Sequence, residues 1–199
     1  RRAAPEAQII VVSPNTPATY TDNQPSSIYF TGDKFKDFNS IDWDSLNLDK
    51  ERTLVFFDDH QAAYRRLNEA ADFGFRHVTF DDNYPLLHGD NYSIKKTCDL
   101  SSHEDWQENF GQGNRKLEAW ERRAFRNHFI TMVDIYFEFP PLFPGPNRFN
   151  VPNKKKPILT EAEAETQLHL TEKEQLFYAQ HLTFMPYIRI DASYSIAQK

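Results

Sequence analysis

Short apolar runs separated by turn-forming residues predict several β-strands along this chain. Gln8 to Val12 and Ser27 to Thr31 are rich in β-branched and aromatic residues and are followed by Ser-Pro-Asn and by Gly-Asp, which predicts two strands that end in loops. Arg52 to Phe57 contains consecutive apolar residues, which in a strand would place apolar side chains on both faces of a sheet. We therefore expect this segment to be a central strand of a parallel sheet. Arg76 to Phe80 predicts a fourth strand.

Between the last two of these strands, the apolar positions change to helical spacing. Apolar residues recur at helical intervals from Gln61 to Gly74, and Gly74 stands where a left-handed residue commonly ends a helix. A strand, a helix and a second strand therefore follow each other within residues 52–80. This order is typical of a βαβ crossover between two parallel strands.

The second half of the chain is expected to add helices and a closing pair of strands. In chain order, its predicted elements are a loop over 84–100, a helix from about Ser102 to Phe129 that Gly111 and Gly113 interrupt, a strand from Phe129 to Phe139, helices over 160–167 and 171–181, and a strand from Met185 to Ile190. Residues 140–184 then form an insertion within the final hairpin. With no repeat and no linker, residues 1–199 are predicted to form a single α/β domain.

Composition narrows the classes of partner. The formal charge is −6, with 29 acidic and 23 basic residues, which argues against a protein built to neutralise nucleic-acid phosphates and favours small or neutral substrates. The run Lys154 to Lys156 is interpreted as solvated surface rather than a phosphate site.

Cys98 is the single cysteine of the sequence, so neither an intrachain disulfide nor a cysteine-based zinc site is expected. We expect no membrane-spanning segment, because no apolar run approaches the roughly 20 residues that a bilayer requires.

Two of the predicted strands end in clusters of polar side chains. Asp58 to His60 follows one of them and Asp81 to Asn83 follows the next. In an open parallel sheet the carboxyl ends of the strands share one edge, where neighbouring strands lie about 4.8 Å apart. Carboxylates that close together repel each other, and a divalent cation such as Mg²⁺ would neutralise them. The alternative interpretation is that these residues cap the turns and helices that follow.

The segment Val55 to Tyr64, followed by Val78 to Asn83, resembles the metal-binding core of class I S-adenosylmethionine (SAM)-dependent O-methyltransferases of the catechol and caffeoyl-CoA type. A related pattern occurs in cephalosporin-hydroxylase-like members of that superfamily. The resemblance covers residues 55–83 and extends to the rest of the chain through the order of strands. It implies a Rossmann-like methyltransferase sheet, α/β, in which parallel strands are closed by a C-terminal antiparallel hairpin.

The resemblance also implies roles for the residues at the two strand ends. Asp58 would be the first ligand of a divalent metal, with Mg²⁺ expected, and Asp82 and Asn83 would be the second and third. The metal would hold the acceptor through its hydroxyl groups. His60 and Asp59 are the candidate catalytic bases.

Three departures from the family's pattern affect the cofactor site and the base. The glycines stand at positions 32, 74, 89, 111, 113 and 145, so the Gly-rich SAM loop is expected in a segment upstream of residue 1, and the domain is expected to be incomplete at its N-terminus. Ser13, Asn15 and Asp33 are the cofactor-binding candidates, with Asn15 in place of the family's ribose-binding acid. Gln61 stands where catechol-type enzymes carry a catalytic lysine, which leaves His60 as the nearest base.

The leading functional hypothesis is metal-assisted, SAM-dependent methyl transfer to a hydroxyl of a small molecule or sugar. The first alternative is a catalytically inactive methyltransferase-like module that acts as a binding or structural subunit of a larger assembly, with residues 140–184 contacting a protein partner. The second is a metal-dependent hydrolase or lyase that uses His60, His77, His88 or His103. Of these, His77 lies within a predicted strand and is expected to be packed or hydrogen-bonded.

Overall fold

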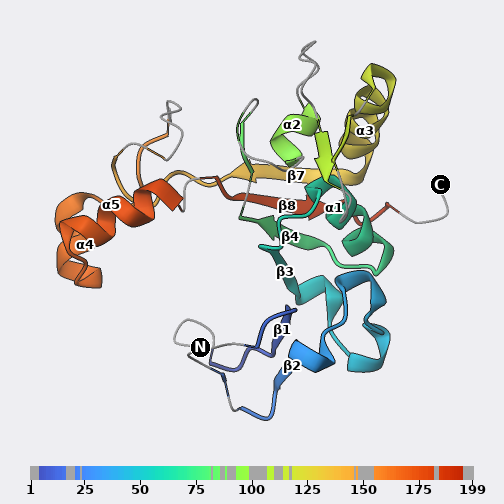
Figure 1. The fold of residues 1–199 in the computed structure, drawn as a ribbon, viewed down its shortest axis with the longest axis horizontal. Helices are drawn as coiled ribbons and strands as arrows, with labels where there is room; N and C mark the ends of the chain where they lie inside the picture. The colour runs from blue at the N-terminus through green and yellow to red at the C-terminus, as the bar shows by residue number, and fades with distance from the viewer. Residues whose placement is uncertain are drawn as a thin grey trace. The chain divides into compact units, whose positions relative to one another are not determined.

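The fold was analysed in a computed structural model (Figure 1). It describes residues 5–16, 21–22, 24–81, 83–85, 88, 93–98, 107–109, 114–116, 118–145, 147, 155–181 and 184–194. Contacts within the chain divide it into two compact units, Arg1–Leu48 and Asp49–Lys199. That these units form the single domain expected over residues 1–199 stays a prediction.

The first unit contains a pair of parallel strands and a set of short turns. Strands β1 (Ile9–Ser13) and β2 (Ser27–Thr31) lie in register, with Ser13 opposite Thr31, so both carboxyl ends lie at one edge of the pair. Both strands fall where the apolar runs predict them. Three 3-10 turns follow, at Gly32–Lys34, Phe38–Ser40 and Asp44–Leu46.

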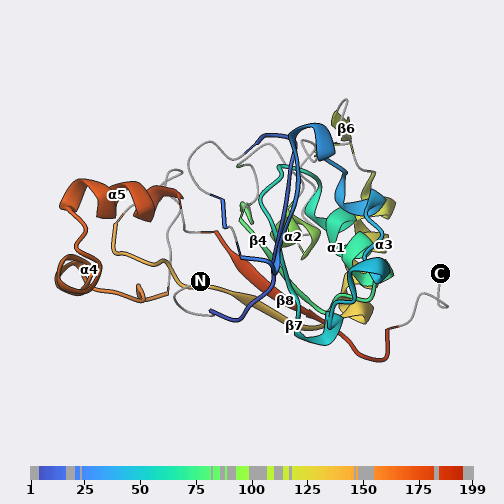
Figure 2. The same cartoon turned by 90° about the horizontal axis from the view of Figure 1, so that it is seen from below.

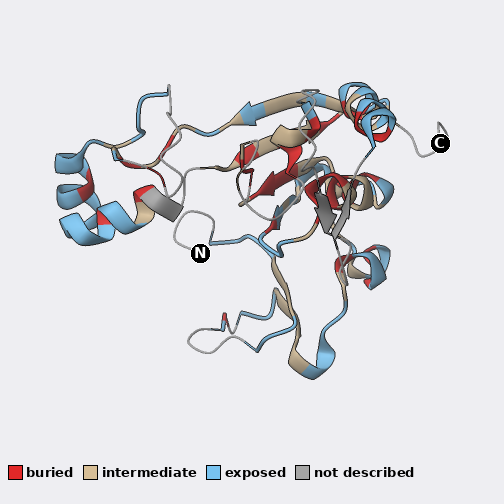
Figure 3. Ribbon diagram, turned by 45° about the horizontal axis from the view of Figure 1, so that its top comes forward, coloured by how far each residue is buried: buried red, intermediate tan, exposed pale blue. Residues whose placement is uncertain are grey.

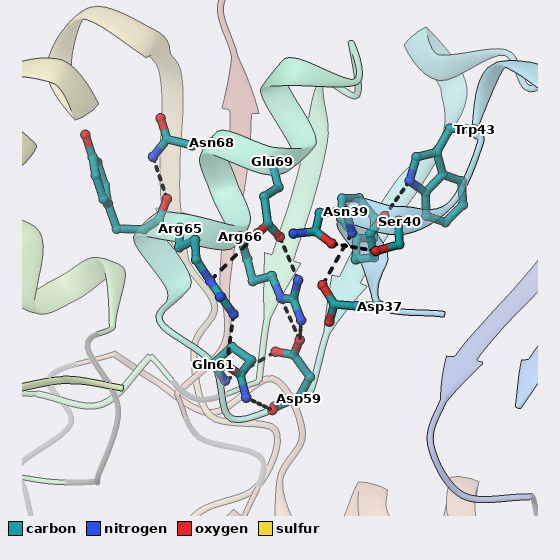
Figure 4. Close-up of polar contacts among 12 residues, drawn as sticks. Asp37, Asn39, Ser40, Trp43, Asp59, Gln61, Arg65, Arg66, Asn68 and Glu69 are labelled. Carbon is teal, nitrogen blue, oxygen red and sulfur yellow. Dashed lines mark hydrogen bonds and ion pairs between the residues drawn. The ribbon is translucent and has the colours of Figure 1, made fainter. Parts of the chain in front are cut away.

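A small aromatic cluster stabilises these turns. Phe38, Ile41 and Trp43 are all buried, and the ring centroids of Phe38 and Trp43 lie 4.9 Å apart. The indole Nε1 of Trp43 donates to the carbonyl oxygen of Phe38 at 2.9 Å (Figure 4). Because this bond satisfies the indole N–H, the largest side chain of the segment is buried without leaving a polar atom unpaired.

The second unit begins with the expected βαβ crossover. Strand β3 (Leu54–Phe57), helix α1 (Ala63–Asp72) and strand β4 (His77–Phe80) follow one another, and β3 and β4 are parallel, with Phe57 opposite Phe80. Gly74 follows the end of helix α1 with a left-handed φ of 82°, and its backbone N–H donates to Ala71 O at 2.9 Å. Glycine adopts this conformation without the steric cost that a Cβ would add, so it ends the helix as predicted.

Two antiparallel strands complete a four-stranded sheet. Strands β7 (Val133–Glu138) and β8 (Pro186–Ile190) pair with each other, and β8 also pairs antiparallel with β4, which gives the order β3-β4-β8-β7. Since β4 and β7 both run opposite to β8, they run in the same direction as each other. The carboxyl ends of β3, β4 and β7 therefore lie along one edge of the sheet, which we call the carboxyl edge.

The architecture is a mixed α/β fold, as expected at the level of class, with its core between the sheet and its helices. Helix α1 contacts β3 and β4, and helix α3 (Ala119–Met132) contacts β7. Figure 2 shows α1, α2 and α3 together beside the strands. Val78 on β4 and Ile188 on β8 are completely buried, and buried residues concentrate on the inner strands and the facing helix surfaces (Figure 3).

The predicted helix over 102–129 is wrong in its starting point. Within that range β5 (Gln107–Asn109) and β6 (Asn114–Lys116) form an antiparallel pair, and Gly111 and Gly113 lie outside the described residues. Helix α3 begins at Ala119 because Glu118 and Glu121 form a reciprocal capping box. The same helix continues to Met132, so β7 begins later than the Phe129 that the sequence predicted.

Two further expectations are corrected. A short helix, α2 (Ile94–Cys98), lies within the loop predicted over 84–100. Strand β3 was expected to be central, but it is an edge strand of the four-stranded sheet, with Leu54 59% and Phe56 52% exposed. Apolar residues on both faces favour a buried strand, but they do not determine how many neighbours the strand has.

The connection between β7 and β8 contains the two helices predicted there. Helices α4 (Glu161–Leu168) and α5 (Glu172–His181) are each preceded by a threonine whose hydroxyl accepts from the backbone N–H of a glutamate three residues later. The carboxylate of that glutamate accepts in turn from the backbone N–H of the threonine. Phe143, Ala164 and Ala179 form a small buried cluster in this segment. None of the helices in the described part of the chain combines the length and the apolar character that spanning a bilayer requires.

The central position of β8 predicts a large difference between two isoleucines. Ile188→Ala should lower the free energy of unfolding by about 3 kcal/mol, because Ile188 is completely buried and its loss leaves a cavity. The matched change Ile130→Ala, at a side chain of α3 that is 56% exposed, should cost less than about 0.5 kcal/mol. Urea titration of both variants measures the difference, and equal costs would contradict the central position of β8.

Candidate functional site

The carboxyl edge brings together the two polar strand ends that the sequence singled out. Asp58 follows β3 and Asp81 follows β4, and the backbone N–H of Asp81 donates to the carbonyl oxygen of Phe57 at 3.0 Å. Asp58 is exposed and Asp81 is partly buried. Asp82 lies outside the described residues. The two strand ends are therefore direct neighbours, as a parallel pair requires.

Asp59 is paired with a buried arginine of helix α1. The Nε and Nη2 atoms of Arg66 lie 2.7 and 2.6 Å from Oδ2 of Asp59, and Nη1 of Arg66 lies 2.6 Å from Oε2 of Glu69 (Figure 4). The Arg66 side chain is only 4% exposed. A buried guanidinium needs its counter-charge, because breaking such a pair leaves a charge without solvent or partner. This pairing favours a structural role for Asp59 over that of a general base.

His60 occupies a strained turn immediately after Asp59. Its φ is 51°, in the left-handed region that non-glycine residues adopt infrequently. The backbone N–H of Gln61 donates to Oδ1 of Asp59 at 3.3 Å, which closes the turn across His60. The histidine is exposed, as is Asp59, whose carboxylate is paired with Arg66.

Asn83 is buried and engaged by three neighbouring segments. Its Nδ2 donates to the hydroxyl of Tyr136 at 2.9 Å, and its Oδ1 accepts from the backbone N–H of Lys95 at 2.8 Å. Its own backbone N–H donates to the carbonyl oxygen of Phe184 at 2.8 Å. Asn83 is 2% exposed. These bonds connect the end of β4 with α2, with β7 and with the approach to β8.

Tyr136 and Lys95 continue this network to a carboxylate on β7. The Tyr136 hydroxyl donates to Oε1 of Glu138 at 2.7 Å, and Lys95 Nζ donates to Oε2 at 2.9 Å. Burial, together with the carboxylate of Glu138, raises the pKa of Tyr136 above its ordinary value, so the hydroxyl stays protonated. Burial also opposes ionisation of Glu138, but the hydrogen bonds from Tyr136 and Lys95 and the charges of Lys95 and Lys155 lower its pKa overall.

Lys95, Tyr136 and Glu138 were not predicted from the sequence as site residues. One signal was present, because Tyr136 and Glu138 stand two residues apart in a predicted strand and so lie on the same face of it. What the sequence lacked was the register of β7 against β8 and of β8 against β4. That register brings Glu138 to the carboxyl edge.

One of the histidines predicted as possible metal ligands, His77, has other partners for both of its ring nitrogens. His77 hydrogen-bonds through Nδ1 to the hydroxyl of Tyr187 at 2.7 Å and through Nε2 to the carbonyl oxygen of Glu51 at 3.0 Å, as expected for a histidine within a strand. The backbone N–H of His88 donates to Pro85 O at 3.2 Å. His103 lies outside the described residues.

A further histidine, His128 on α3, lies between two tyrosine hydroxyls. Its Nδ1 is 2.6 Å from the hydroxyl of Tyr64, and its Nε2 is 2.6 Å from that of Tyr194. The ring of Tyr64 also stacks on Phe125, with centroids 4.2 Å apart. These contacts tie α1, α3 and the segment after β8 together, which favours a structural role for Tyr64.

The described residues provide only part of the predicted metal site. Among them, no group of three or more histidine, cysteine, aspartate or glutamate side chains is arranged to hold a metal ion. Asn83, the predicted third ligand, already uses both atoms of its amide within the protein. Carboxylate oxygens at the strand ends have the chemistry that Mg²⁺ prefers. Together with Asn83, however, the described carboxylates do not complete a ligand set.

The predicted cofactor residues lie in the first unit, at the carboxyl ends of β1 and β2. Ser13 ends β1, and its Oγ accepts from the backbone N–H of Asn15 at 3.2 Å. Asp33 lies in the 3-10 turn after β2 and is exposed. Ser13 and Asn15 are therefore in contact, and a role for these residues in SAM binding stays a prediction.

Comparison with protein-family models, with curated proteins and with solved structures found no match to this chain.

The network around Glu138 predicts a stability that depends on pH. Glu138→Gln should lower the free energy of unfolding by about 1 kcal/mol at pH 7, because it removes a charged acceptor from Tyr136 and Lys95. The folded-state pKa of Glu138 lies below its ordinary value of 4.5, so this stabilisation is present above pH 4.5 and is lost as the pH falls through the folded pKa.

Urea titrations of the wild type and of Glu138→Gln between pH 7 and pH 3 measure this effect. The difference between the two proteins should shrink as the pH falls below 4.5. The control Glu165→Gln, at an exposed position on α4, should change stability by less than about 0.5 kcal/mol throughout. A Glu138→Gln effect of the same size at every pH would contradict the role assigned to the carboxylate.

Proposed function

We propose that this chain is part of a Rossmann-like methyltransferase domain that transfers a methyl group from SAM to a hydroxyl of a small molecule or sugar. The observation that carries the proposal is the strand order β3-β4-β8-β7. A parallel pair is followed by an antiparallel hairpin, which is the arrangement that the resemblance predicts for the last strands of such a sheet. The parallel pair β1 and β2 supports the same interpretation as the preceding strands.

The carboxyl edge is where the acceptor would bind, since ligands of open α/β sheets bind beyond the carboxyl ends of the strands. A hydroxyl that accepts a methyl group must lose its proton, and His60 is an exposed candidate base at this edge. Asp58 and Asp81 would bind hydroxyl groups of the acceptor and orient them, so that positioning supplies part of the rate enhancement.

A divalent cation, when bound, would lower the pKa of the acceptor hydroxyl. Asp58 and Asp82 are the ligands that the proposal retains. Asn83, with its amide engaged by Tyr136 and Lys95, would act by holding the end of β4 in place.

A second function has support of its own. Asp59 and Asn83, two of the residues that the resemblance selects, are committed to contacts within the protein. This commitment favours a methyltransferase-like module that binds a partner without catalysing transfer. The two proposals differ in whether the protein binds SAM.

Calorimetric titration of the full-length protein with SAM, with and without Mg²⁺, separates the two functions. Methyl transfer predicts SAM binding, and it predicts that Mg²⁺ binding measured with the SAM complex weakens at least about tenfold in Asp58→Ala. The control Asp134→Ala, at the opposite end of β7, should leave both affinities unchanged. A well-folded full-length protein that does not bind SAM would contradict methyl transfer and favour the binding module.

A further inference from the structure

The carboxyl edge carries opposite charges at its two ends. Asp58 and Asp81 lie at the ends of β3 and β4, whereas two lysines meet at the end of β7. Lys95 Nζ donates to Oε2 of Glu138 at 2.9 Å, and Lys155 Nζ donates to the backbone carbonyl oxygen of the same residue. The two lysines come from segments separated by 60 positions in the sequence, and the fold brings both to Glu138.

Lys155 has contacts that the sequence did not predict. From the sequence alone, Lys154 to Lys156 is expected to be solvated surface, and Lys155 and Lys156 are indeed exposed. Lys155 also reaches the sheet, where its Nζ lies 4.9 Å from the centroid of the Phe137 ring. Both its hydrogen bond to Glu138 and this cation–π contact hold the ammonium group beside the end of β7.

The two charged ends are separated by about the length of a small molecule. Glu138 lies opposite Pro186, and Thr79 Oγ1 donates to Pro186 O at 2.7 Å, so Glu138 lies close to the row in which β4 ends. Two strand spacings separate β4 from β7, which is about 10 Å. A monosaccharide that carries one phosphate is of comparable length.

Glu138 occupies the place that an external anion would take. Its side chain is 29% exposed and that of Lys95 is 39% exposed, so solvent and small solutes reach the pair. Lysine ammonium groups bind phosphate as compact point charges. Here one ammonium group pairs with the carboxylate of Glu138, and the other donates to the backbone carbonyl oxygen of the same residue. The chain as a whole carries a charge of −6, which repels phosphate ions. Phosphate binding therefore requires a local group of positive charges such as this one.

We propose that Lys95 and Lys155, gathered around Glu138 at the β7 end of the carboxyl edge, bind the phosphate group of a phosphorylated acceptor. The acceptor's hydroxyl groups then lie toward the ends of β3 and β4. The identity of the acceptor rests on the proposed function, whereas the phosphate site does not. Glu138 holds the two ammonium groups in place when phosphate is absent and competes with phosphate for them.

Calorimetric titration of the full-length protein with inorganic phosphate at low ionic strength, without SAM or metal, tests this site. Lys95→Gln and Lys155→Gln should each weaken binding at least about threefold, since each removes one cation. Glu138→Gln should strengthen it, because the competing carboxylate is lost. Lys173→Gln on α5 is the control of equal charge change and should leave the affinity unaltered.

The pattern across variants decides the outcome, and circular dichroism identifies any variant that fails to fold. Equal weakening by Lys173→Gln, or phosphate binding that no variant alters, would mean an adventitious ion only and would overturn the site. Weaker phosphate binding in a folded Glu138→Gln variant would contradict the proposal that Glu138 competes with phosphate for the two lysines.

A hexose phosphate should bind more tightly than both inorganic phosphate and the unphosphorylated hexose, and the lack of that preference would overturn the acceptor class. If the variants change phosphate affinity as predicted but the protein does not bind SAM, the phosphate site stands and only the proposed methyl transfer is contradicted.

Discussion

The hydrogen bonds of the Asn83 side chain fix the arrangement on which the rest of the candidate site depends. One amide group joins the end of β4 to α2 through Lys95 N and to β7 through the Tyr136 hydroxyl. Asn83 is only 2% exposed, so water cannot easily replace either hydrogen-bond partner. Loss of either bond would therefore leave a buried polar group unpaired. Asn83 thus connects elements that are far apart in the sequence and fixes the end of β4 relative to Tyr136 and Lys95.

The same arrangement gives the carboxyl edge its chemical character. Because β8 runs antiparallel to both β4 and β7, the polar residues that follow β3 and β4 share an edge with Glu138 at the end of β7. Asp59 is neutralised by the buried Arg66 and contributes mainly to structure. The edge thus has carboxylates at one end and ammonium groups at the other. This is the pattern expected of a site for a small, polar molecule with groups of both kinds.

The sequence predicts those features that depend on neighbouring residues. Apolar spacing placed β1, β2, β4 and α1 within a residue or two at most ends, because each element is specified by its own side-chain period. The start of α3 was missed because its capping box pairs Glu118 with Glu121, and glutamate is not among the residues that favour the N-cap position. The network at Glu138 was missed for a different reason, since it depends on strand register between segments that are remote in the sequence.

The most direct test of this account is the hydrogen exchange rate of the Lys95 amide, measured by NMR in the wild type and in Asn83→Ala. That N–H lies in the first turn of α2, where helix amides lack partners within the helix, and it donates to Asn83 Oδ1 at 2.8 Å. The account predicts protection in the wild type and exchange at least about tenfold faster in the variant, with the Ala164 amide on α4 unchanged. A Lys95 amide that exchanges at the unprotected rate in the wild type, or equally fast in both proteins, would contradict it.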